Sequence, residues 1–144
     1  MERAEIIRFA NEQMQIAGLY GWGFKFNSNK SGLGVCKFGK RRIELSIYNT
    51  DDFNIRNTIL HEIAHAVVGP EHGHNHVWRS KAMALGCTGE RCGIMEAPHS
   101  YNVVCKVHGV IGKRHRRPKN GLRSSCPKCS PRFNTAYLLE FVRV

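Results

Sequence analysis

One stretch of the sequence, residues 54–70, constrains the fold more than any other. It contains the pattern His61-Glu62-x-x-His65 inside an apolar segment that ends at Gly69-Pro70. Residues four apart lie on one face of a helix, so on a helix both imidazoles can point at the same metal ion. Neutral imidazole suits Zn²⁺, which in catalytic sites has three protein ligands and one open position. The stretch therefore predicts a metal-binding helix.

The apolar residues around the motif support this helix. They recur every fourth residue, with further apolar side chains beside them, which predicts a helix buried on most sides. Asp51 or Asp52 can cap its start, and Gly69-Pro70 ends it. Unpaired polar groups in a core are costly, so we favour a metal site over a chance match with hydrogen-bonded histidines. The apolar stripe consists of Ile55, Ile59, Ile63 and Val67, with Leu60, Ala64 and Val68 alongside.

Glu62 is the predicted catalytic residue. It follows the first histidine, so its carboxylate can reach a water beside the metal without binding the metal itself. Zinc lowers the pKa of such a water to roughly 7 and polarises a carbonyl. A carboxylate can then take the proton as general base and return it to the leaving amine. The motif therefore predicts hydrolysis by an activated water.

The third metal ligand must come from beyond the Gly-Pro break. The longer metzincin pattern, H-E-x-x-H-x-x-G-x-x-H, fails because Val68 and Glu71 occupy its Gly and last His positions. Three histidines follow the break: His72, His74 and His76. By residue type alone, all three can serve as the third ligand.

The segment Gly73-His74-Asn75-His76-Val77-Trp78 narrows this choice. Here the chain resembles the SprT-like (Spartan-type) zinc metalloproteases, in which H-E-x-x-H is followed by G-H-G-x-x-[F/W]. The resemblance implies that His74 is the third zinc ligand and that Trp78 packs behind it, while Asn75 departs from the second Gly. If His72 is aligned with the ligand position of the family pattern instead, His76 falls at the position of the core aromatic residue. We therefore predict His74, with His72 and His76 as alternatives.

The rest of the first hundred residues predicts an α+β fold. Residues 2–17 have helical spacing, residues 20–50 alternate between apolar and other residues around two turns, and residues 75–85 predict another helix. We expect a helix, a small three-stranded antiparallel sheet, the H-E-x-x-H helix and a further helix, an order that agrees with the SprT-like family. This is a minimal zincin-like metalloprotease core. In zincins an edge strand of such a sheet can align a substrate peptide, but the sequence does not show which strand is open.

A second metal site is predicted near the C-terminus. Cys105-x-x-His108-Gly109 and Cys126-x-x-Cys129 are separated by 17 residues, the spacing of a structural zinc ribbon with Cys3His ligands. His115 is a substitute for His108. SprT-like proteins often carry such a ribbon, so the resemblance spans roughly residues 1–140. The remaining cysteines, Cys36, Cys87 and Cys92, are interpreted as free or buried thiols.

These assignments give three segments and two cofactors. We predict an SprT-like zincin protease domain over residues 1–97, a basic zinc ribbon over 101–139 and a tail over 140–144. One catalytic and one structural Zn²⁺ are expected. Apolar residues over 133–141 predict a closing strand or short helix against the ribbon.

The ribbon segment is strongly basic. The chain has a net charge of +11, and residues 97–139 contain nine Lys/Arg and no Asp/Glu. Such asymmetry indicates a polyanionic partner, and we expect this partner to be DNA bound without sequence preference. The loop between the knuckles has no aromatic residue, so it offers phosphate contacts but no base-stacking surface of its own. The predicted phosphate-binding residues are Lys113, Arg114, Arg116, Arg117 and Lys119.

The resemblance implies proteolysis of proteins on DNA, such as proteins crosslinked to it. Two alternatives are a catalytically idle nucleic-acid-binding module and a peptidase unrelated to DNA. The N-terminal residues lack the apolar region of a signal peptide, and no apolar run approaches the roughly 18 residues of a membrane span. We therefore expect a cytoplasmic or nucleoid-associated protein that is not secreted and has no membrane partner. The sequence does not indicate an oligomeric state.

Overall fold

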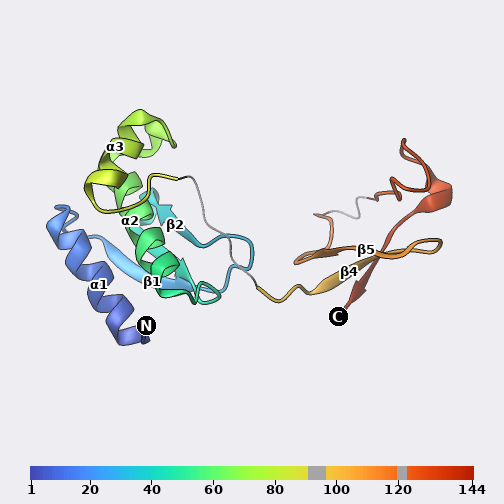
Figure 1. The fold of residues 1–144 in the computed structure, drawn as a ribbon, viewed down its shortest axis with the longest axis horizontal. Coiled ribbons are helices and arrows are strands. Elements are labelled where there is room, and N and C mark those ends of the chain that lie inside the picture. The colour runs from blue at the N-terminus through green and yellow to red at the C-terminus, as the bar shows by residue number, and fades with distance from the viewer. Residues whose placement is uncertain (91–96, 120–122) are drawn as a thin grey trace. The chain divides into compact units, whose positions relative to one another are not determined.

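The computed structural model describes residues 1–90, 97–119 and 123–144. The chain divides into two compact units, Met1–Glu96 and Ala97–Val144 (Figure 1). This division falls one residue before the predicted end of the protease domain at residue 97. Within the described ranges, no helix combines the length and the apolar character needed to cross a membrane.

The first unit has the α+β composition that the sequence predicts. A helix precedes a small sheet, and two further helices follow it, joined by the short 3-10 turn Pro70–His72. Another 3-10 turn, Phe38–Lys40, separates the second and third strands. The elements are α1 (Arg3–Ile16), β1 (Gly23–Asn27), β2 (Gly34–Lys37), β3 (Arg42–Ser46), α2 (Asp52–Val68) and α3 (His76–Ala84).

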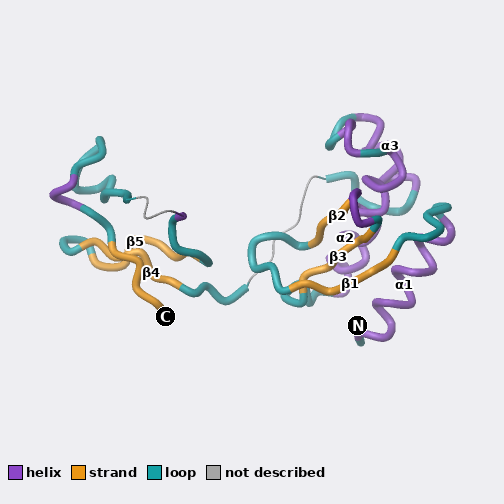
Figure 2. Tube along the Cα trace, turned by 180° about the vertical axis from the view of Figure 1, so that it is seen from behind, coloured by secondary structure: helices purple, strands orange, loops and turns teal. Residues whose placement is uncertain are grey.

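The sheet of the first unit is mixed, so the prediction of an antiparallel sheet is wrong. Its strand order is β1-β3-β2, with β3 antiparallel to β2 but parallel to β1 (Figure 2). The chain passes from β1 to β2 without pairing them, and β3 then inserts between the two. Alternation of residues predicts strands, but it carries no information about partner or direction. As a result β2 is an edge strand, and it lies against α2.

The core lies between the sheet and the helices. Ile43 and Leu45 of β3 are 1% exposed and face apolar residues of α1 and α2. A second cluster, which we call the Trp78 cluster, joins α2 to α3. Its buried members are Leu60, Ala64, Trp78, Ala82 and Cys87.

Two polar residues of β3, Glu44 and Ser46, are buried as well, although their alternation with apolar residues is typical of a half-exposed strand. Glu44 is 3% exposed. Burial raises the pKa of its carboxyl, but hydrogen bonds from neighbouring side chains outweigh this and hold the pKa below its usual value. The donors are Asn27 Nδ2 at 3.1 Å, Arg42 Nε at 2.7 Å and Lys37 Nζ at 3.2 Å. The buried carboxylate therefore stays charged, which a pattern of alternating residues does not reveal.

Strand β2 lies very close to α2 at Gly34. A Cβ at this position would lie 2.6 Å from Thr58 Cγ2 and 2.9 Å from the backbone oxygen of Glu44. We expect Gly34→Ala to lower the free energy of unfolding by about 1–3 kcal/mol, the usual cost of overpacking. Urea unfolding measures this change. Gly39→Ala is the matched control because nothing lies within 4 Å of a Cβ there; equal losses from both variants would contradict the prediction.

The second unit is an antiparallel sheet with the order β5-β4-β6. Its strands are β4 (Tyr101–Cys105), β5 (Gly109–Arg114) and β6 (Glu140–Arg143), and a 3-10 turn covers Thr135–Tyr137. The segment 140–144, set apart above as a tail, thus contains β6, which pairs with β4. The closing strand or short helix predicted over 133–141 corresponds to this 3-10 turn and the start of β6, but local sequence does not show where the strand begins or that β4, some 40 residues earlier, is its partner.

Candidate metal centres

Three imidazoles meet at one point of the first unit. His61 and His65 come from α2, and His74 comes from the turn before α3. Their Nε2 atoms lie 3.1 Å (His61–His74), 3.2 Å (His61–His65) and 3.1 Å (His65–His74) apart. Nitrogens that share one tetrahedral zinc with bonds of 2.0–2.1 Å are about 3.3 Å apart. The donor set and its spacing therefore fit a zinc ion with one open position.

The turn after α2 brings His74 back to the helix. Gly69 has φ 97° and Gly73 has φ 54°, and both values belong to the region that favours glycine. Asn75, the departure from the family pattern, caps α3: its Oδ1 accepts hydrogen bonds from the N–H groups of Val77 (3.0 Å) and Trp78 (3.2 Å). A capping side chain here fixes the start of α3 and with it the position of His74.

Trp78 supports all three rings from behind. The indole is 0% exposed, and its centroid lies 4.6 Å from His61, 5.1 Å from His65 and 4.7 Å from His74. Its Nε1–H donates to the backbone oxygen of His61 at 3.2 Å. The resemblance implied an aromatic residue behind the ligand, and this is where the fold places Trp78.

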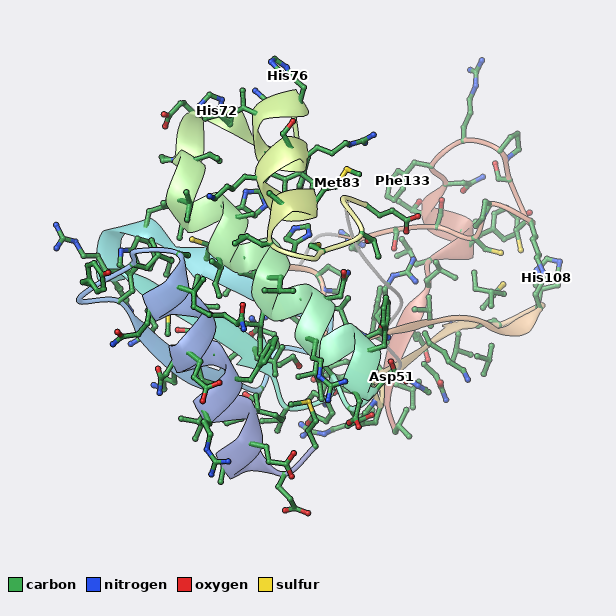
Figure 3. The ribbon with its side chains drawn as sticks, turned by 60° about the vertical axis from the view of Figure 1, so that its left-hand side comes forward. Asp51, His72, His76, Met83, His108 and Phe133 are labelled. Atoms are coloured by element: carbon green, nitrogen blue, oxygen red, sulfur yellow. The ribbon has the colours of Figure 1, made fainter. Side chains whose placement is uncertain are left out.

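The alternative ligands lie elsewhere. Figure 3 shows His72 and His76 at the outer end of the turn, with their side chains directed away from the unit. His72 Nδ1 is 3.2 Å from Asn75 Nδ2, and His72 Nε2 is 3.7 Å from Glu71. The structure thus brings His74 to the other two imidazoles and leaves His72 and His76 apart from them.

The environment keeps the imidazoles neutral. Burial, together with the neighbouring His65 and His74, lowers the pKa of His61 to about 4. Burial and the adjacent His74 lower the pKa of His65 to about 4 as well. At neutral pH both rings therefore have a free lone pair, which is the form that binds a metal.

Glu62 lies beside this triad. The residue is 8% exposed, and its Oε1 is 3.8 Å from His61 Nε2. Burial raises the pKa of its carboxyl to about 7, although a hydrogen bond from the Cys36 backbone opposes the shift. A carboxyl whose pKa lies near neutral pH can both accept and return a proton.

A pocket of about 430 Å³ opens over these groups. One wall is the edge strand β2 with the residues just before it, and the other is α2. Leu33 accepts a hydrogen bond from Ser46, so Gly34 and Cys36, one and three positions later, direct their backbone groups to the free edge. Among the described residues, no tyrosine, lysine or arginine lines this pocket. Its walls include Leu33, Gly34, Val35, Cys36, Asn57 and Thr58.

A second cluster of donor atoms occupies the other unit. His108 Nδ1 lies 3.5 Å from Cys105 Sγ, 3.6 Å from Cys126 Sγ and 3.4 Å from Cys129 Sγ. Cys105 Sγ and Cys129 Sγ are 3.6 Å apart. These separations fit four ligands around one closed tetrahedral zinc. His115, the alternative to His108, is not in the cluster.

The basic loop borders a cavity of about 550 Å³ in the second unit. Arg114, Arg116 and Arg117 line it, while Lys113 and Lys119 are exposed nearby in the sequence. The Arg117 guanidinium lies 5.3 Å over the ring of Tyr101. Sequence reasoning missed this aromatic neighbour, because β4–β5 pairing rather than chain proximity brings Tyr101 to the loop.

The other cysteines have different surroundings. Cys36 lines the pocket of the first unit, and burial, with the nearby Glu62, raises the pKa of its thiol to about 12. Cys87 is buried in the Trp78 cluster. Every cysteine within the described ranges is a free thiol, whereas Cys92 lies outside those ranges.

An α+β core that joins two helical histidines, an adjacent glutamate and a third histidine from the next turn defines a metallopeptidase-type domain. A model of the SprT-like family matches residues 4–109, and the chain belongs to that family. The match covers the first unit and reaches Cys105 and His108 of the second. Neither the search of curated proteins nor that of solved structures found a match to the chain.

Proposed function

We propose that the protein is a zinc-dependent endopeptidase in which Glu62 is the general base. The observation that carries this proposal is the convergence of three imidazole Nε2 atoms beside one buried carboxylate. His61, His65 and His74 would hold the ion, which when bound supplies Lewis acidity to a water and to the scissile carbonyl. The SprT-like family match supports the metallopeptidase class.

The residues of the chain have separate roles in this reaction. The Glu62 carboxylate takes a proton from the attacking water and returns it to the nitrogen of the leaving amine. The Cys36 N–H donates to Glu62, so the free edge of β2 offers the backbone groups of Gly34 and the Cys36 carbonyl to a substrate peptide in extended conformation, which would place the scissile bond near Glu62. The pocket walls then exclude part of the surrounding water.

Replacing Glu62 by Gln tests the general base. We expect Glu62→Gln to lower the rate of proteolysis by a factor of about 10²–10⁴, the usual contribution of a positioned base. Zinc content should not change, because the proposal does not make Glu62 a ligand. Cleavage of a DNA-bound protein by the wild type and the variant, with elemental analysis of both, measures the two effects. A fully active Glu62→Gln would remove the proposed mechanism and favour an idle zinc module.

We further propose that the substrates are proteins bound or crosslinked to DNA. The support is the charge of residues 97–139 and the clustering of three arginines around one cavity. Arginine and lysine contacts to phosphates give affinity without reading the base sequence. DNA would then hold the protease close to proteins on the same molecule.

The salt dependence of DNA binding tests this partner. If most cations among residues 113–119 contact phosphates, the slope of log K against log salt should be about −3 to −5, at roughly −0.7 to −0.9 per contact. Replacing Arg114, Arg116 and Arg117 with Ala should flatten the slope by about 2–3 units and weaken all DNA sequences equally.

A matched variant has the same change of net charge in the first unit. Its substitutions replace the exposed residues Arg8, Arg56 and Arg79 with Ala. We expect this variant to keep the wild-type slope. Equal slopes for the wild type and both triple variants would mean that Arg114, Arg116 and Arg117 face solvent and do not contact DNA phosphates. The peptidase unrelated to DNA would then be the better account.

A further inference from the structure

A loop of the first unit runs along α2 outside the metal pocket. It comprises residues 87–90, and we call it the 87–90 loop. The start of the loop is hydrogen-bonded to Asn57. The Thr88 N–H donates to Asn57 Oδ1 at 3.0 Å, and Cys87 Sγ lies 3.6 Å from the backbone oxygen of Asn57. Cys87 is also 5% exposed within the Trp78 cluster. The beginning of the loop is therefore fixed to α2.

The end of this loop meets His61. The backbone carbonyl of Glu90 acts on the His61 ring as a hydrogen-bond acceptor, which raises the pKa of this imidazole against the larger effect of burial. Because His61 Nε2 faces His65 and His74 at 3.2 and 3.1 Å, the donor is Nδ1. Asn57 and His61 are four residues apart on one face of α2, separated by a rise of about 6 Å. A loop that is bonded to Asn57 thus runs along about one turn of α2 to reach His61.

The bend between the two ends requires glycine. Gly89 has φ 78°, and a Cβ there would lie 3.0 Å from Met83 Cγ and 3.2 Å from Arg79 Cγ. The Glu90 N–H donates to Thr88 Oγ1 at 3.4 Å. The loop is therefore bonded to α2 at Asn57 and passes close to α3 at Gly89, which restricts where the Glu90 carbonyl can lie.

We infer that Asn57 is a positioning residue for His61: by anchoring the 87–90 loop, it holds the Glu90 carbonyl against the Nδ1–H and leaves Nε2 free to bind the metal. A hydrogen bond of this kind fixes the tautomer and the ring orientation of a metal-binding histidine. Asn57 lies outside the H-E-x-x-H pattern and precedes it by four residues. The inference rests on the proposed metal-binding role of the three histidines.

Metal affinity in the absence of substrate tests this role. The affinity of the full chain for Co²⁺ at the three histidines, measured by chelator competition, should fall about 10–100-fold in Asn57→Ala, as for the loss of other outer-shell partners. Asn57→Asp keeps an acceptor oxygen for the Thr88 N–H and should bind at least as tightly as the wild type. The Cys105–His108–Cys126–Cys129 cluster is an internal reference that neither variant should change.

A second variant is designed to displace the 87–90 loop through its contact with α3 rather than with α2. Gly89→Val does not touch α2 or the pocket, but its side chain would collide with Met83 and Arg79 and displace the Glu90 carbonyl. It should weaken the three-histidine site by a similar factor. In NMR spectra of the loaded protein, the His61 Nδ1–H should exchange with water faster in Asn57→Ala and Gly89→Val than in the wild type.

The outcomes separate this inference from the proposed function. A wild type that binds no metal at the three histidines would overturn the proposed function itself. A wild type that binds, with Asn57→Ala binding equally well, would overturn only the role of Asn57. Equal weakening by Asn57→Ala and Asn57→Asp, with an equal fall in the melting temperature of the metal-free protein, would show a structural role instead.

Discussion

His74→Ala is expected to abolish proteolysis and to weaken the metal site of the first unit, whereas His72→Ala and His76→Ala should leave both close to wild type. Removing one of three protein ligands should reduce zinc affinity by more than the 10–100-fold that loss of an outer-shell partner causes. The reason lies in the geometry: His74 Nε2 is 3.1 Å from both His61 and His65, while His72 and His76 lie away from them.

The three histidine variants form a matched set, because each removes one imidazole from the same short segment. Zinc affinity measured by chelator competition and proteolysis of an unstructured protein would be compared across the set. The thermal melt of each metal-free variant controls for folding. Loss of proteolysis in His72→Ala, with activity retained in His74→Ala, would show that His72 and not His74 is the third metal ligand.

Cys126→Ser is expected to remove one of two zinc ions and to unfold the second unit. Cys126 is 0% exposed, and its backbone N–H donates to the oxygen of Tyr137 at 2.9 Å. Apparent binding free energies of structural zinc are about 10–16 kcal/mol in small zinc domains, so we expect a unit of this size to depend on a zinc ion at the four-residue cluster for folding. The first unit has its own core and should stay folded.

Elemental analysis and amide NMR spectra measure the two effects. The wild type should contain two zinc ions per chain and Cys126→Ser one, with signals lost from residues 97–144 and retained from 1–90. His115→Ala is the control, because this histidine lies outside the cluster and its loss should leave both ions bound. Loss of an ion from His115→Ala would instead make His115 a ligand.

The local parts of the fold were predictable from the sequence. The α2 helix begins at Asp52 behind the cap Asp51, whose Oδ2 accepts the Asn54 N–H at 3.0 Å, and it ends before Gly69. Caps, glycines and four-residue periodicity act within a few residues, so the sequence shows them directly. The family resemblance has the same origin, since its motif lies within residues 61–78, and the family match confirms it.

The non-local parts were not predictable. The parallel pairing of β1 with β3 and the addition of β6 to β4 depend on contacts between distant segments. The same limit applies to the site: the 87–90 loop and the free edge of β2 reach the histidines through tertiary packing, and Asn57, although it lies four residues before His61 on α2, acts only through that loop. No residue pattern marks them, because each is ordinary in its local context.

The position of Trp78 gives the proposed three-histidine metal site a fluorescence signal. Its indole is enclosed by protein and lies within about 5 Å of three imidazoles, whereas Trp22, the other tryptophan, belongs to the α1 side of the core. A paramagnetic ion such as Co²⁺ bound by these rings would quench the fluorescence of Trp78 at short range. In a Trp22→Phe background, one emission band would therefore report the occupancy of the three histidines without a substrate or a label.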